Sequence, residues 1–122
     1  MENKAALKLI DKIIIDLDNT GINTDVLISD ITKLRSYALE EQIPLVVKVL
    51  RLASEHIAAH DSFLIPMPVE ESEEEEEEVV AVVETENEPV ESLKYLIALT
   101  RNLNNKINIS DLKEYRDLLT NY

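Results

Sequence analysis

The sequence contains one glycine, Gly21, among 122 residues, and no cysteine. Sheet proteins and phosphate-binding loops use glycine where the backbone turns tightly or approaches a ligand closely. The scarcity of glycine therefore indicates helices joined by short connections. The lack of cysteine excludes disulfides, zinc sites built on thiolates and thiol nucleophiles.

Apolar residues recur at intervals of three and four along most of the chain, as they do in helices that bury one face. Gly21 is expected to end the first helix, and Pro44 suits the first turn of the third. The spacing predicts five helices, over residues 3–18, from Asn23 or Thr24 to about residue 40, over residues 44–60, from Pro89 to about residue 101, and from Asn108 or Ser110 onward. The stripe predicted to be buried in the second helix is Leu27, Ile28, Ile31, Leu34, Ala38 and Leu39.

These elements predict an all-α fold, a small helical bundle of about five helices. Residues 1–65 are expected to form a three-helix unit, and residues 90–122 a helical hairpin that packs on it, because two helices alone bury too little surface. Residues 66–89 are interpreted as an acidic, proline-flanked, low-complexity linker. The six successive glutamates at 73–78 repel one another, so this linker is expected to be disordered.

The net charge of −13 is concentrated in one place. Residues 66–91 contain twelve Glu and no Lys or Arg, and the rest of the chain has 13 acidic and 12 basic residues. An acidic tract repels phosphate backbones, so nucleic acid is not an expected partner. No apolar run is long enough to span a membrane, which predicts a cytoplasmic protein.

Residues 13–20, Ile-Ile-Ile-Asp-Leu-Asp-Asn-Thr, are similar to the first motif of the haloacid-dehalogenase-like phosphatases. That motif is an apolar strand followed by Asp-x-Asp-x-Thr. The resemblance implies that Asp16 is a nucleophile, that Asp18 is a general acid/base, and that Mg²⁺ lies between them. The match covers eight residues, and the later motifs of that family have no counterpart in this sequence.

The same residues resemble a degenerate calcium loop of the EF-hand or dockerin type between two helices. Asp16, Asp18 and Thr20 would be ligands at loop positions one, three and five, with Gly21 at position six. The twelfth position is Leu27, where such loops place a bidentate carboxylate. The alternative interpretation is an ordinary helix end followed by a capped helix start.

The connection between the last two helices repeats parts of this pattern. Asn102, Asn104 and Asp111 match ligand positions three, five and twelve, but Thr100 stands at position one, where an acid is expected. Asparagine, serine and aspartate are also the residues that cap helices, which gives a structural alternative. Each of the two loops therefore lacks one key carboxylate.

Two further short patterns involve the only histidines and a valine-rich stretch. His56 and His60 are four residues apart near the end of the third helix, a spacing that can hold zinc, but the sequence offers no third ligand.

Val80, Val82 and Val83, which have acidic residues on both sides, resemble a SUMO-interacting motif. That resemblance implies a segment that adds a strand to the sheet of a partner.

No catalytic constellation is complete in this sequence, so we predict no catalytic residue and no cofactor. The predicted function is non-enzymatic, a protein–protein interaction or regulatory module whose partner is an unidentified protein. Leftover apolar surface could also be buried in a homodimer. The alternative from another class is a calcium-binding helix-loop-helix protein, followed by a Mg²⁺-dependent phosphatase.

Overall fold

The computed structural model describes residues 1–68 and 88–122. Most of the predicted linker, residues 69–87, lies outside the described residues. Within the two described ranges the all-α prediction is confirmed, because they contain no strand and form the helices α1 (Lys4–Thr20), α2 (Thr24–Glu40), α3 (Pro44–His60), α5 (Glu88–Leu99) and α6 (Lys106–Thr120).

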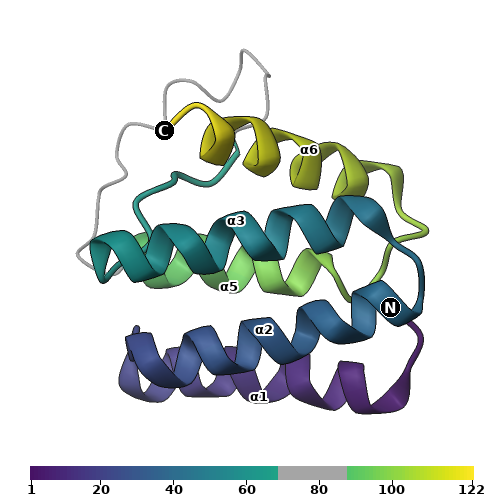
Figure 1. The fold of residues 1–122 in the computed structure, drawn as a ribbon, viewed down its shortest axis with the longest axis horizontal. Helices are drawn as coiled ribbons and strands as arrows, with labels where there is room; N and C mark the ends of the chain where they lie inside the picture. The colour runs from purple at the N-terminus through teal and green to yellow at the C-terminus, as the bar shows by residue number, and fades with distance from the viewer. Residues whose placement is uncertain (69–87) are drawn as a thin grey trace, which may run out of the picture.

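The five helices form a closed ring in which each helix packs against two others. The order around the ring is α1, α2, α3, α6, α5 and back to α1. Helices joined by a short turn run in opposite directions. Because the ring has an odd number of members, one neighbouring pair must run parallel, and Figure 1 shows that this pair is α3 and α6. The hairpin of α5 and α6 thus contacts the first three helices through α1 and α3.

The core is built from the apolar stripes that the sequence predicts. In α1 the stripe buries Ala6, Leu9, Ile10, Ile13 and Leu17. In α3 the residues with the same spacing, Val46, Val49, Leu50, Ala53 and Ile57, are all fully buried. Each large aliphatic side chain of this kind contributes about 1.5–3 kcal/mol when it leaves water. The hydrophobic effect therefore supplies the main force that holds the helices in the ring.

The first helix ends with the predicted glycine. Gly21 has φ 73°, a conformation that residues with a Cβ rarely adopt, and its N–H donates to the carbonyl of Leu17. Before α1, the side chain of Asn3 accepts hydrogen bonds from the amides of Ala5 and Ala6. Pro44 begins α3, as predicted. These local signals place the helix boundaries without help from tertiary contacts.

Two predicted boundaries are wrong. The first helix continues to Thr20, two residues beyond the prediction. The last helix begins at Lys106 and is capped by Asn105, whose side-chain oxygen accepts from the amides of Ile107 (2.8 Å) and Asn108 (3.2 Å). Neither Asn108 nor Ser110 is the cap. Several adjacent residues can cap a helix, so the capping preference alone could not select among them.

Residues 63–68 have no regular structure and carry two buried side chains, Phe63 and Ile65, into the core. The buried hydroxyl of Ser92 in α5 donates to the carbonyl of Ile65 at 2.7 Å. The hydroxyl of Tyr115 in α6 donates to the carbonyl of Ser92 at 2.9 Å. Burial raises the pKa of Tyr115 well above its ordinary value, so the phenol stays a neutral donor. These bonds connect the segment after α3 to both helices of the hairpin.

No helix in the two described ranges is long and apolar enough to cross a membrane.

Substituting Ser92→Ala should test this buried junction. The change leaves the Ile65 carbonyl without its donor inside the core, so we expect the free energy of unfolding to fall by about 1–3 kcal/mol. Urea denaturation followed by circular dichroism measures the loss. The matched control is Ser29→Ala on the exposed face of α2, where a change within about 0.5 kcal/mol is expected. Equal effects of the two substitutions would contradict the assigned role of Ser92.

Candidate binding surface at one end of the bundle

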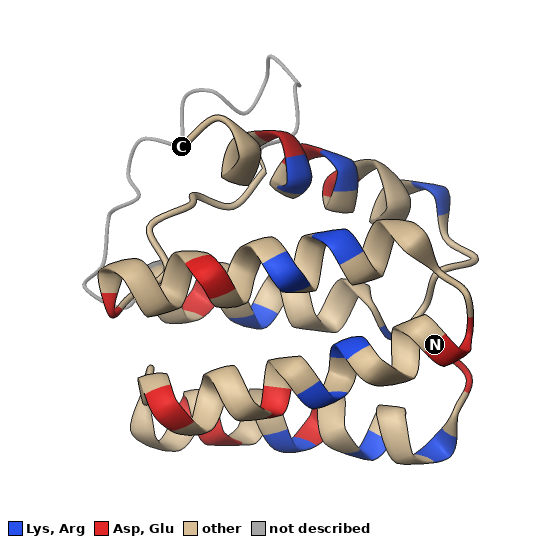
Figure 2. Cartoon of the chain, in the orientation of Figure 1, with Lys and Arg blue, Asp and Glu red and all other residues tan. Residues whose placement is uncertain are grey.

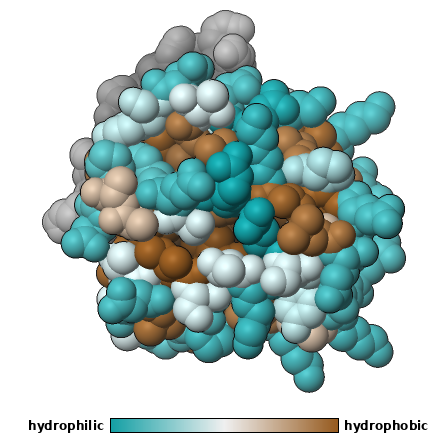
Figure 3. All heavy atoms as spheres, viewed as in Figure 1, coloured by the Kyte–Doolittle hydropathy of each residue, from teal (hydrophilic) through white to brown (hydrophobic). Residues whose placement is uncertain are grey.

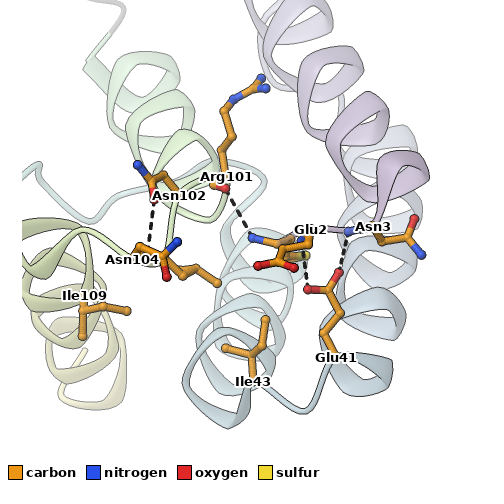
Figure 4. A pocket seen from close by; sticks show the side chains of 10 residues that line it. Glu2, Asn3, Glu41, Ile43, Arg101, Asn102, Asn104 and Ile109 are labelled. Carbon is orange, nitrogen blue, oxygen red and sulfur yellow. Dashed lines mark hydrogen bonds between the residues drawn. The ribbon is translucent and has the colours of Figure 1, made fainter.

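A hollow lies at one end of the bundle, where the N-terminus, the α2–α3 turn and the α5–α6 loop meet. Its volume is about 770 Å³. We call it the end cavity. Figure 4 shows how its side chains come from these three separate segments, and the residues that line it are Met1, Glu2, Asn3, Glu41, Ile43, Arg101, Asn102, Leu103, Asn104 and Ile109.

Backbone and charged groups hold the three segments of the end cavity together. The Met1 ammonium donates to the carbonyls of Thr100 (2.9 Å) and Arg101 (3.3 Å). The Glu41 carboxylate accepts from the amides of Glu2 (3.0 Å) and Asn3 (2.9 Å). Burial lowers the pKa of the Met1 ammonium. Burial alone would raise the pKa of Glu41, but these two hydrogen bonds and the nearby ammonium outweigh it and lower that pKa.

The polar groups of the end cavity are therefore largely used in building it. The Arg101 guanidinium is also occupied, because it pairs with Asp11 of α1. What the cavity offers to a ligand is aliphatic surface from Ile43, Leu103 and Ile109, bordered by side-chain amides. Its lining contains no Ser, Thr, Cys, Lys or His that could act as a nucleophile or as an imidazole base.

A second hollow, of about 370 Å³, joins the end cavity at Ile43. It lies between the end of α2 and the start of α3, and we call it the α2–α3 groove. Gln42, in the turn between the two helices, has φ 59°, a left-handed conformation that is uncommon for residues other than glycine. The residues that line the groove are Leu39, Gln42, Ile43, Pro44, Val47, Lys48 and Arg51.

Leu39 corrects one prediction from the sequence. It is part of the stripe predicted to be buried in α2, but its side chain is 55% exposed and forms a wall of the groove. The three-four spacing rule predicts burial for Leu39 as well as for Ala38, although the two side chains lie about 100° apart around the helix. Ala38 points into the core and is fully buried. The position of Leu39 at the edge of the apolar stripe is the one feature of the sequence that indicates the α2–α3 groove.

The candidate metal ligands of the first loop lie within a helix. α1 extends through Thr20, so Asp16 and Asp18 occupy helical positions about 200° apart and do not converge. Lys12 donates to Asp16 at 3.0 Å and to Asp30 of α2 at 2.7 Å. Asp18 pairs with Lys94 of α5, and the Thr20 hydroxyl donates to the carbonyl of Asp16. The strand that the phosphatase motif requires before Asp16 is also replaced by helix.

The candidate ligands of the second loop have structural partners as well. The Asn102 side chain accepts from the amide of Asn104 at 3.1 Å, as in a turn stabilised by an asparagine. Asp111 lies inside α6 and accepts from the hydroxyl of Tyr95. This loop is at the end of the bundle opposite the first loop (Figure 1), so the two sets of candidates do not come together. Among the described residues, no group of three or more Asp, Glu or His is arranged to hold a metal ion.

His56 and His60 are brought together, with ring centroids 4.5 Å apart. The Nε2 atom of His56 accepts from the amide of Leu64 at 3.0 Å, which places the proton of the neutral ring on Nδ1. Tyr122 stacks edge-on against both rings, and Phe63 against His56. Burial, and secondly the charge of His60, lower the pKa of His56. The pair thus supports the segment after α3.

The remaining candidates, Val80, Val82 and Val83, lie outside the described residues. Comparison with known proteins found no matching family model, no similar curated protein and no similar solved structure.

Titration with Ca²⁺ and Mg²⁺ should distinguish metal binding from helix capping. Because the carboxylates of Asp16 and Asp18 diverge and pair with lysines, we expect no saturable shift of the backbone amides at residues 16–27 and 102–111 up to millimolar metal. Two-dimensional NMR of the labelled protein measures these amides. Saturable shifts confined to the two loops would instead support the calcium interpretation.

The stability of the fold should depend on pH through His56. The pKa of His56 is lowered in the folded state, so below about pH 6.5 the unfolded chain binds more protons and the free energy of unfolding falls. Thermal melts between pH 7.5 and 5.5 should show this loss in the wild type. His56→Gln should flatten the dependence of the melting temperature on pH. His60→Gln should keep part of this dependence, because the charge of His60 is the smaller cause of the lowered His56 pKa.

The difference between these slopes separates His56 from the Met1 ammonium, whose pKa is also lowered. Equal slopes in the wild type and in His56→Gln would contradict the lowered pKa of His56, because a histidine with the same pKa in the folded and unfolded states makes no contribution to the slope.

Proposed function

We propose that the protein is a non-enzymatic protein-interaction module that binds a partner at the end of the bundle formed by the end cavity and the α2–α3 groove. The observation that carries this proposal is the exposed apolar surface where the two hollows meet at Ile43. Exposed apolar surface that is bordered by polar residues is a common feature of protein–protein interaction sites. The module is expected to act in the cytoplasm, in agreement with the sequence analysis.

Two properties of this end favour binding of a partner over catalysis. The acidic and cationic groups that could do chemistry, such as Glu41 and the Met1 ammonium, are held by backbone groups. The apolar side chains come from the ends of helices and from the short connections between them, which the ring holds in place, so the surface is already formed before a ligand arrives. A preformed surface costs less entropy on binding than a segment that has to fold.

Affinity capture with quantitative mass spectrometry tests the proposal. The full chain is immobilised and exposed to a lysate of the cells that make it, in parallel with Leu39→Asp and Ile15→Asp. Leu39 and Ile15 are both 55% exposed, on α2 and α1 respectively, so the two substitutions add the same charge at equal exposure. We expect proteins captured by the wild type to be lost at least tenfold with Leu39→Asp and retained with Ile15→Asp.

Loss of the same proteins with both variants would point to a general effect of charge. Capture that neither variant changes would place the partner surface elsewhere on the molecule.

A further inference from the structure

The α2–α3 groove combines an apolar floor with cations on its border. Leu39 and Val47 supply aliphatic surface from the two helices, and Lys48 and Arg51 follow on α3. Lys48 forms no ion pair within the described residues, and Arg51 pairs only with Glu55, at 3.2 Å and at an exposed position. Such an exposed pair holds its partners weakly, so both cations are available to a ligand.

A third cation, Arg35, does not line the groove but lies beside it, on the side of α2 that faces α3. The side of α2 that faces α3 is marked by Thr24, whose hydroxyl donates to Asp61 at the end of α3. The side that faces α1 is marked by Asp30, which pairs with Lys12. Arg35 lies three helical turns from Thr24 and one turn before Leu39, which places it on the α3 side.

Arg35 also has an unused hydrogen-bond donor. Its Nε atom is buried and has no acceptor among the described residues. A carboxylate is the acceptor that a guanidinium prefers, and it would pair with the rest of the half-buried Arg35 side chain, because the Nε atom itself is enclosed. Figure 2 shows Lys and Arg positions along both α2 and α3 on the face toward the viewer, and Figure 3 shows apolar surface exposed between polar side chains on that face.

The acidic groups nearest to the groove do not neutralise these cations. The Glu41 carboxylate is turned toward the amides of Glu2 and Asn3, on the α1 side of α2. Glu40 lies about 100° further around α2 than Leu39 and faces solvent. Glu55 offsets only Arg51. The groove is thus locally positive on a chain whose net charge is −13.

We propose that the α2–α3 groove binds a short acidic segment of another protein. The aliphatic side chains of that segment would lie on Leu39 and Val47, and its carboxylates would pair with Arg35, Lys48 and Arg51. This inference rests on the proposed function and specifies the chemistry of the partner. Charge complementarity of this kind fixes register and suppresses partners of the wrong charge.

The chain's own acidic tract has a similar composition, but its attachment to α5 keeps its valines from this groove. Val79, the first valine of the stretch 79–83, precedes Glu88, where α5 begins, by nine residues, which span at most about 32 Å. In the ring, α5 is separated from the groove by α1 and α2 on one side and by α6 and α3 on the other. Crossing two helices, each about 10 Å wide, needs about 20 Å, and α5 starts at the end of the bundle opposite the groove (Figure 1), which adds about 25 Å along the 17-residue α3. The occupant is therefore assigned to a separate chain.

Selection from a displayed library of random 12-residue peptides tests the assignment. The bait is the full chain, compared with Lys48→Glu/Arg51→Glu and with the matched control Lys8→Glu/Lys113→Glu, whose lysines are exposed on α1 and α6. We expect the wild type to enrich peptides that combine several Asp or Glu with Leu, Ile or Val. Their affinity should fall at least tenfold on the groove variant, stay within twofold on the control, and weaken as salt is raised. Circular dichroism verifies that each variant is folded.

Other outcomes would overturn the assignment in distinguishable ways. If the enriched peptides are not acidic but their binding is lost with Leu39→Asp, the result contradicts an acidic partner and still supports the proposed interaction module. If the wild type enriches no peptide over the groove variant, the result contradicts both the acidic segment as the occupant and the proposed interaction module.

Two further outcomes would identify a different occupant. Enrichment that occurs only after residues 73–78 are replaced by Gly and Ser would show that the chain's own tract fills the groove. Self-association that depends on concentration and disappears in the groove variant would assign the groove to a second copy.

Discussion

Burial of the apolar helix faces holds the ring together, and the buried hydrogen bonds among Ile65, Ser92 and Tyr115 fix how the hairpin of α5 and α6 is placed in it. α5 and α6 are a two-helix hairpin, which cannot bury enough surface to be stable by itself. The Ser92 hydroxyl fixes the hairpin to the segment that follows α3, and Tyr115 fixes the two helices of the hairpin to each other. Once the hairpin is positioned, α5 packs on α1, α6 packs on α3, and the ring is complete.

Much of this fold follows from local features of the sequence. The apolar stripes, the stop at Gly21 and the start at Pro44 depend on helix geometry and on backbone preferences within a few residues. The cap at Asn105 and the exposure of Leu39 could not be predicted in the same way. The first required a choice among neighbouring asparagines and a serine with nearly equal preferences. The second depends on how closely α2 approaches α3 at its last turn.

The end cavity could not be predicted from the sequence for a different reason. Met1, Glu41 and Arg101 are far apart in the chain, and only the ring brings them to one cavity. Asp16 and Asp18, by contrast, have a spacing that resembles motifs of other proteins. In the structure their carboxylates instead pair with lysines, Asp16 with Lys12 of the same helix and Asp18 with Lys94 of α5. A motif read without its structural context thus identified helix-stabilising charges.

The topology of the ring also bears on how the chain can vary. α3 ends and α5 begins at the same end of the bundle (Figure 1), so the connection between them does not have to cross the molecule. Each doubling of the length of such a loop costs only about 0.6 kcal/mol in closure entropy. On closure entropy alone, a change in the number of residues between Pro68 and Glu88 should therefore alter the stability of the five helices little.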